Sequence, residues 1–82
     1  MMTFIVNGEE TKVEPQSTIG ECAELALQQT GHSHRDITEF HAHLNSEQLQ
    51  YDWELNDLGI EYGHVITSND RIFLSLKAGV GA

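Results

Sequence analysis

The hydrophobic positions at the start of the chain predict a β-hairpin. Residues 3–6 are rich in β-branched and aromatic side chains, which is typical of a strand. Asn7-Gly8 follows, and this dipeptide favours a two-residue hairpin turn because both of its positions adopt positive φ. We therefore expect residues 11–14 to form the returning strand, which ends at Pro15 because proline cannot donate a hydrogen bond to a sheet.

A helical period follows the hairpin. Four apolar residues have the i, i+3, i+4, i+7 spacing of a helix with one buried face: Ile19, Cys22, Ala23 and Ala26. Thr18 and Glu21 have the spacing of a capping box, so the helix is expected to begin there. Gly31 is placed where helices end in a left-handed turn. Gly20 is expected to loosen the first turn, because glycine costs about 1 kcal/mol relative to alanine inside a helix.

A period of two appears in the second half of the chain. Phe40, Ala42 and Leu44 alternate with His41 and His43. This alternation predicts a strand with its apolar residues inward and both histidines outward. The two histidines are therefore expected on the exposed face of a sheet.

The last clear strand covers residues 71–77. Ile72, Leu74 and Leu76 point one way along it, and it is apolar enough to lie centrally, beside the first strand. Residues 48–51 are expected to form a short edge strand.

The segment between these two strands is less regular. Leu55, Leu58 and Ile60 are expected to fill the core from a short helical turn. Residues 64–67 fit either a strand or an ordered loop.

These elements predict an α+β fold in which one main helix crosses one face of a mixed four- to five-stranded sheet. We assign residues 1–77 to this domain. Residues 78–82 are Ala-Gly-Val-Gly-Ala, and five small residues cannot fill a core. They are therefore expected to form a flexible C-terminal tail.

The charge balance narrows the classes of partner. The 82 residues include 13 acidic and 4 basic side chains, for a net charge of −9. Nucleic acids and anionic membranes both attract clustered Lys and Arg, so neither is expected as a partner. The acidity fits either docking on a basic partner or the maintenance of solubility. The sequence contains no signal peptide and no run of 18 apolar residues, so a cytoplasmic location is expected.

The elements, in this order and spacing, resemble the ubiquitin-like family over almost the whole chain. The most specific segment is Val-Glu-Pro-x-x-Thr-Ile at residues 13–19, followed by Leu-x-Asp-x-x-Ile at residues 55–60. The other matching positions are residues 3–6, Gly31, residues 48–49 and residues 72–77. The pattern is most similar to bacterial ubiquitin-like proteins that accompany activating, conjugating and deubiquitinase-like enzymes. The resemblance implies the β-grasp fold.

The resemblance also implies a protein modifier that has no catalytic site and needs no cofactor. In this family an activating enzyme adenylates the C-terminal carboxylate, and a conjugating enzyme then helps to transfer it to a target protein. Gly81 matches the family's terminal glycine, so a peptidase is expected to remove Ala82. Val80 departs from the usual Gly-Gly ending. Lys77 and Gly79 are expected to be recognised by the activating enzyme. The alternative is that the tail is only a frayed terminus.

A second departure concerns the exposed apolar patch of the family. Its central isoleucine corresponds to His43 here, and a valine of its last strand corresponds to Ser75. With Ile5, His41 and Phe73, these residues are expected to form a partner-binding face. Ordinary ubiquitin receptors are expected to bind this face poorly.

Other functions remain open at this point. The same fold and tail suit a sulfur carrier with a C-terminal thiocarboxylate, or a non-covalent interaction module. His32-x-His34 and His41-x-His43 have a spacing that can chelate a transition metal, but no cysteine pair supports either. Solvated or partner-facing histidines are therefore favoured over a metal site. Cys22 lies on the apolar helix stripe and is expected to be a buried, unreactive thiol.

Overall fold

The computed structural model describes residues 1–78. The strands in this part of the chain are β1 (Met2–Val6), β2 (Glu9–Val13), β3 (Phe40–Leu44), β4 (Glu47–Leu49) and β5 (Arg71–Leu76). The α-helices are α1 (Ile19–Gln29) and the short α2 (Leu58–Glu61). Two 3₁₀ turns are labelled η1 (Ile37–Glu39) and η2 (Leu55–Asp57).

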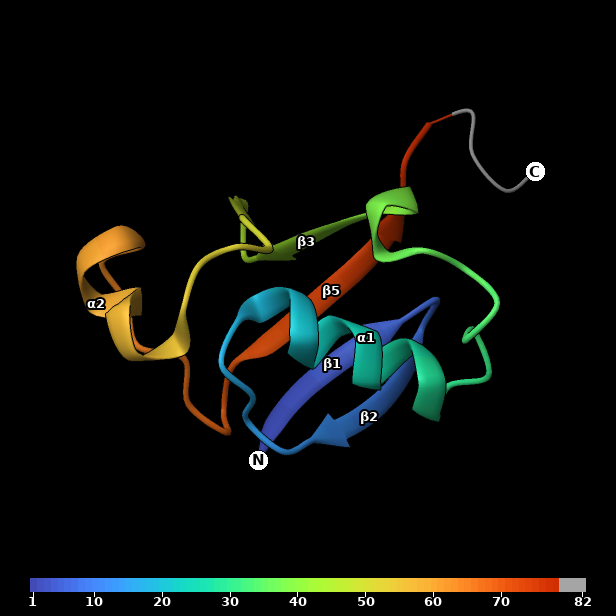
Figure 1. The fold of residues 1–82 in the computed structure, drawn as a ribbon, viewed down its shortest axis with the longest axis horizontal. Coiled ribbons are helices and arrows are strands. Elements are labelled where there is room, and N and C mark those ends of the chain that lie inside the picture. The colour runs from blue at the N-terminus through green and yellow to red at the C-terminus, as the bar shows by residue number, and fades with distance from the viewer. Residues whose placement is uncertain (79–82) are drawn as a thin grey trace.

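The strands form one mixed sheet in the order β2-β1-β5-β3-β4. β5 lies in the centre and runs parallel to β1, whereas the other neighbouring pairs are antiparallel. α1 crosses one face of this sheet, and α2 lies at one end of it (Figure 1). The predicted α+β class, with one main helix and the last strand beside the first, is confirmed.

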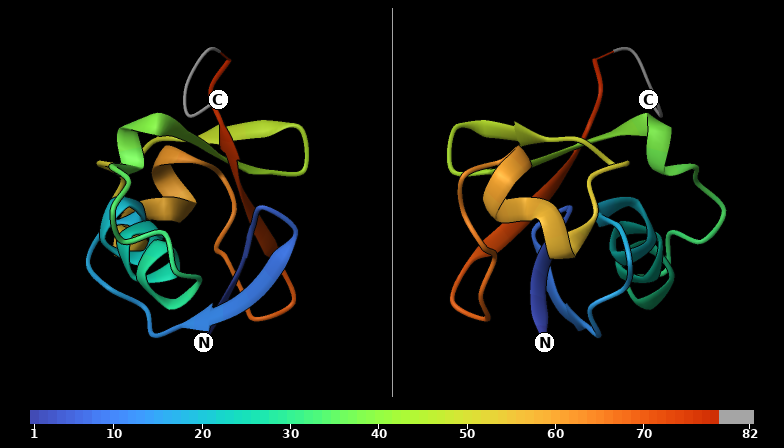
Figure 2. Two further views of the ribbon diagram at one scale, coloured as in Figure 1. Left: turned by 90° about the vertical axis from the view of Figure 1, so that its right-hand side faces the viewer. Right: turned by 60° about the vertical axis from the view of Figure 1, so that its left-hand side comes forward.

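The core fills the space between α1 and the sheet. Figure 2 shows the two layers from the side, with α1 on one side of the core and β1, β2 and β5 on the other. The helix buries all four residues of the predicted stripe, together with Leu27. The largest fully buried side chains from the strands are Phe4, Val6, Val13, Leu49 and Ile72.

The β1–β2 hairpin has the predicted turn. Asn7 and Gly8 have φ of 52° and 81°, as a two-residue turn of this type requires. Val6 pairs directly with Glu9 across the turn. β2 therefore begins at Glu9, earlier than the sequence pattern indicated, and it ends at Val13.

Both ends of α1 are capped as predicted. The Thr18 hydroxyl accepts a hydrogen bond from the Glu21 backbone N–H at 3.2 Å, and the Thr18 N–H donates to the Glu21 carboxylate at 3.1 Å. At the C-terminal end Gly31 has φ of 82°. The His32 N–H donates back to the Leu27 carbonyl at 2.7 Å, which closes a Schellman motif and fixes where His32 leaves the helix.

The expectation for Gly20 is wrong. The Gly20 N–H donates to the Tyr51 carbonyl at 2.9 Å, and a Cβ at this position would lie 3.1 Å from the same oxygen. The Tyr51 hydroxyl in turn donates to the Phe40 carbonyl at 2.6 Å. Glycine at this position therefore permits a close approach between α1 and the 50–53 segment, and it does not mark a loose turn.

The segment between β4 and β5 agrees with the sequence only in part. Leu58 is buried and Leu55 packs against the core as expected, but Ile60 is 87% exposed and does not fill the core. Residues 64–67 form a loop, not a strand. No helix within residues 1–78 is long and apolar enough to cross a membrane.

Candidate functional site: the outer face of the sheet and the end of β5

Five predicted site residues lie together on the face of the sheet that points away from α1. They are Ile5, His41, His43, Phe73 and Ser75, and we call them the outer sheet face. The strand register brings them together, because Ile5 and His43 both pair with Phe73, while His41 pairs with Ser75. Side chains of paired residues in neighbouring strands lie on the same face of a sheet.

Phe73 is the centre of the outer sheet face. Its ring stacks on that of His43, with 5.6 Å between centroids and 17° between planes. Nε2 of His43 is 3.0 Å from Oγ of Ser75, so a hydrogen bond holds the imidazole from a second side. Phe73 nevertheless remains 39% exposed, which is high for an aromatic side chain in the middle of a sheet. An exposed aromatic ring with fixed neighbours is a suitable anchor for a protein partner.

Charged side chains flank the outer sheet face at one end. The Glu10 carboxylate lies 3.6 Å from Nζ of Lys12 and 3.4 Å from the Arg71 guanidinium. Lys12 Nζ also donates to the buried Thr3 hydroxyl at 3.2 Å. Two cations and one anion give this end a charge of +1 in a chain with net charge −9. The sheet face therefore differs in charge from most of the molecule.

The C-terminal end of β5 positions the residues that the sequence assigns to conjugation. The Lys77 N–H donates to the Glu39 carbonyl at 2.9 Å, and this bond ties the residue after β5 to η1. Lys77 is half-buried and Ala78 is exposed. The other predicted positions, Gly79, Gly81 and Ala82, lie outside the described residues.

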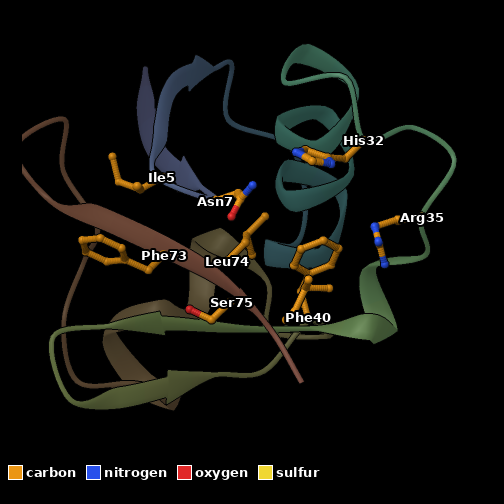
Figure 3. Close-up of a pocket in the computed structure, with 10 residues that line it drawn as sticks. Ile5, Asn7, His32, Arg35, Phe40, Phe73, Leu74 and Ser75 are labelled. Carbon is orange, nitrogen blue, oxygen red and sulfur yellow. The ribbon is translucent and has the colours of Figure 1, made fainter. Parts of the chain in front are cut away.

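A groove with a volume of about 500 Å³ opens at this end of the sheet, and we call it the β5 groove. Figure 3 shows its lining, with Ile5 and Phe73 at one end, Leu74 and Phe40 in the middle, and His32 and Arg35 at the other end. Sequence reasoning missed this groove, because segments far apart in the chain form it. The sequence pattern placed Leu76 with the inward-pointing residues of the last strand, but in the structure Leu76 is 43% exposed beside this groove.

The other three histidines, His32, His34 and His64, lie outside the outer sheet face. The rings of His32 and His34 have centroids 6.3 Å apart. His64 instead bonds the Asp70 carboxylate at 3.0 Å. Among residues 1–78, no group of three or more His, Cys, Asp or Glu side chains is placed to hold a metal ion.

The structure shifts the pKa values of the Asp70 carboxyl and the Cys22 thiol. Hydrogen bonds from the Thr67 N–H and from His64 lower the pKa of Asp70, which braces the loop before β5. Burial raises the pKa of the Cys22 thiol, whose sulfur lies 3.5 Å from that of Met2. Cys22 is fully buried, as predicted. A thiol that is buried and protonated is a poor nucleophile.

Comparison with known proteins gives one match. The model of a family described as "Protein of Unknown function (DUF2604)" matches residues 1–82, so the chain belongs to that family. No curated protein and no solved structure matches the chain.

Proposed function

We propose that this member of the DUF2604 family is a ubiquitin-like protein modifier with the β-grasp fold. Two lines of evidence support the fold assignment. The first is the sequence resemblance described above. The second is the order of elements, with a hairpin, one helix across the sheet, and the last strand parallel to the first in the centre.

One observation supports the function most strongly, namely the position of the chain where it leaves β5. β5 continues past the last residue of β1 that pairs with it, and Lys77 is bonded by its backbone to η1. Among residues 1–78, Leu74 is the last that belongs to the buried core. Lys77 is therefore held at the end of the sheet, shortly before the residues that the sequence assigns to conjugation. This arrangement suits a body that presents its C-terminal residues to an enzyme.

The proposed reaction needs no catalytic group from this chain. A peptidase hydrolyses the bond between Gly81 and Ala82, which frees the Gly81 carboxylate. That carboxylate attacks the α-phosphate of ATP and releases pyrophosphate, and an enzyme thiolate then displaces AMP to form a thioester. An amino group of a target protein attacks the thioester, and the thiolate leaves. We propose that these steps occur in the cytoplasm, where ATP is available.

The outer sheet face has a separate role in this proposal. Activating, conjugating and processing enzymes must hold the body while they act on Gly81. Phe73 and His43 offer an exposed aromatic surface for that contact. Because His43 and Ser75 replace aliphatic residues of the family's patch, enzymes specific for this modifier are expected to read a different surface.

The proposal is tested with an N-terminally tagged full-length chain in an extract of its source cells, with and without ATP. We expect ATP-dependent adducts on an immunoblot, of which the thioester fraction disappears after treatment with a thiol. Gly81→Leu is expected to abolish adducts, because glycine lets the backbone pass closely through a narrow active site. Val80→Gly is the matched control and keeps them.

Other outcomes are equally informative. A product in which one oxygen is replaced by sulfur, without protein adducts, would assign a sulfur carrier. Absence of any ATP-dependent change in the wild-type chain would contradict the modifier proposal.

A further inference from the structure

β5 has an unpaired edge where it passes the end of β1. The parallel ladder between β1 and β5 ends at Val6 and Leu74, but β5 continues to Leu76. On the opposite side β5 stays paired with β3, where Phe40 is the partner of Leu76. Among the strands of residues 1–78, the last two residues of β5 therefore have a neighbour on one side only.

The backbone groups of Leu76 face the unpaired side. The Lys77 N–H donates to the Glu39 carbonyl, so Lys77 directs its backbone groups toward β3. Successive residues of a strand direct their N–H and C=O groups to opposite sides. Leu76 therefore presents a donor and an acceptor toward the space beyond Val6, where the chain turns away at Asn7. An exposed pair of this kind is a template for an added strand.

The β5 groove lies along this same edge. Phe40 and Leu74, which are each 3% exposed, lie at its apolar floor, and Leu76 is 43% exposed beside them. An extended peptide lying here would cover Leu76 and place alternate side chains toward this floor. A volume of about 500 Å³ is in the range of pockets that enclose small ligands or a few peptide residues.

The charge of the groove indicates the chemistry of its occupant. None of the described residues that line it is acidic, although the chain contains 13 acidic residues. Arg35 and His32 line one end, and Lys77 follows Leu76 directly. The Arg35 guanidinium lies 3.1 Å from the Glu39 carboxylate, which fixes its position at the groove and offsets part of its charge, whereas the described residues place no carboxylate within 4.0 Å of Lys77 Nζ. This distribution favours a negatively charged occupant and disfavours a basic one.

We propose that the β5 groove binds an extended acidic peptide segment of a partner protein, which adds to the free edge of β5 as a short strand. The apolar side chains of the segment would face the groove floor, and its carboxylates would lie near Arg35 and His32. Peptide binding requires no reaction at Gly81. The test can therefore fail or succeed independently of the modifier proposal.

The test uses the full-length chain and three fluorescent peptides with blocked ends. The first alternates Glu and Val, the second alternates Lys and Val, and the third is the Glu-Val peptide with alternate amides methylated. We expect saturable binding of the first peptide by fluorescence anisotropy. The second and third are expected to bind about tenfold more weakly or not at all, because they lose charge complementarity or backbone donors. In ¹⁵N-resolved NMR spectra the first peptide should shift the Leu76 and Gly8 amides most.

A pair of variants provides the matched control. Leu76→Asp places a carboxylate beside the groove and removes an apolar contact, so affinity for the Glu-Val peptide should fall about tenfold. Ile60→Asp makes the same change at a residue on α2, where Ile60 is 87% exposed, and should leave affinity unchanged. The comparison of methylated and unmethylated peptides uses the wild-type chain and does not depend on whether either variant folds.

Three results would overturn the proposal. One is equal binding of the acidic and basic peptides. Another is NMR shifts confined to His41, His43 and their neighbours in β4, which lie on the sheet but do not line the groove. The third is concentration-dependent self-association that Leu76→Asp abolishes, since this would assign the groove to a second copy of the chain.

Discussion

The imidazole of His43 lies nearly parallel to the ring of Phe73, with 5.6 Å between their centroids and 17° between their planes. The two residues are direct partners across β3 and β5, and Ser75 holds the imidazole at 3.0 Å. Phe73 is thus supported on one side and open to solvent on another. We regard this pair as the main feature of the outer sheet face.

The stacked pair is expected to stabilise the fold as well as the surface. In a double-mutant cycle of His43→Ala and Phe73→Ala, the coupling in the free energy of unfolding should be about 0.5–1 kcal/mol, as for other cross-strand ring pairs. Chemical denaturation of the four proteins measures this coupling. His34→Ala combined with Phe73→Ala is the control, because His34 is an exposed residue in the loop after α1 and is not part of the outer sheet face, so that the coupling should be near zero. A coupling near zero for His43 and Phe73 would show that the stacking contributes nothing in solution.

Gly20→Ala is expected to destabilise the protein, although alanine is the better helix former. The new Cβ would lie 3.1 Å from the Tyr51 carbonyl and 3.2 Å from the Tyr51 Cβ. Tyr51 cannot withdraw easily, because its carbonyl and its hydroxyl are both hydrogen-bonded. We expect a net loss of about 1 kcal/mol in the free energy of unfolding. The cost of overpacking the contact with Tyr51 should exceed the gain in helix propensity from glycine to alanine.

Gly59→Ala is the matched control for that change. Its Cβ would meet only Val65 Cγ2, at an ordinary contact distance of 3.7 Å. The substitution should leave stability unchanged or raise it slightly. A rise in the denaturation midpoint of Gly20→Ala equal to that of Gly59→Ala would contradict the proposed close approach.

Ionisation of the Tyr51 hydroxyl is expected to destabilise the folded protein at alkaline pH. Burial raises the pKa of its hydroxyl to about 12, whereas in the unfolded chain the pKa is about 10. The protonated form is therefore favoured by folding. The stabilisation that this group contributes is fully present below pH about 10 and is lost as pH rises through about 12.

Absorbance titration of tyrosinate measures the Tyr51 shift directly. The wild-type chain should show a transition with a midpoint near 12 that is missing in Tyr51→Phe. Tyr51→Phe should also be less stable at neutral pH by about 1 kcal/mol, because the Phe40 carbonyl loses its donor. If the transition that Tyr51→Phe lacks has instead the ordinary midpoint near 10, this result would contradict the burial of the Tyr51 hydroxyl.

Local sequence signals predicted most of the fold. The Asn7-Gly8 turn, the Thr18 cap and the Gly31 stop each depend on the conformation of a few neighbouring residues, and all three are confirmed. The period of two in β3 likewise placed its histidines on the outside. Such features can be predicted because neighbours in sequence determine them.

The features that sequence missed depend on distant segments. Gly20 is close to the backbone of Tyr51, some thirty positions later, and no local pattern indicates that approach. Ile60 fits an apolar repeat, yet α2 is short and turns it outward. The β5 groove needs the hairpin turn, the segment after α1 and the end of β5 to meet in space. For the same reason the strand pattern predicted the direction of Leu76 but not its exposure.

We infer that Gly81 becomes the reactive end of the protein. The most direct test is mass spectrometry of the tagged chain purified from its source cells, with intact mass and a peptide map of the material in adducts. We expect a free form that lacks Ala82, and adduct peptides in which an amide bond joins the Gly81 carbonyl to the nitrogen of an amino group of another protein. A population that consists only of the unprocessed, unlinked 82-residue chain would contradict it.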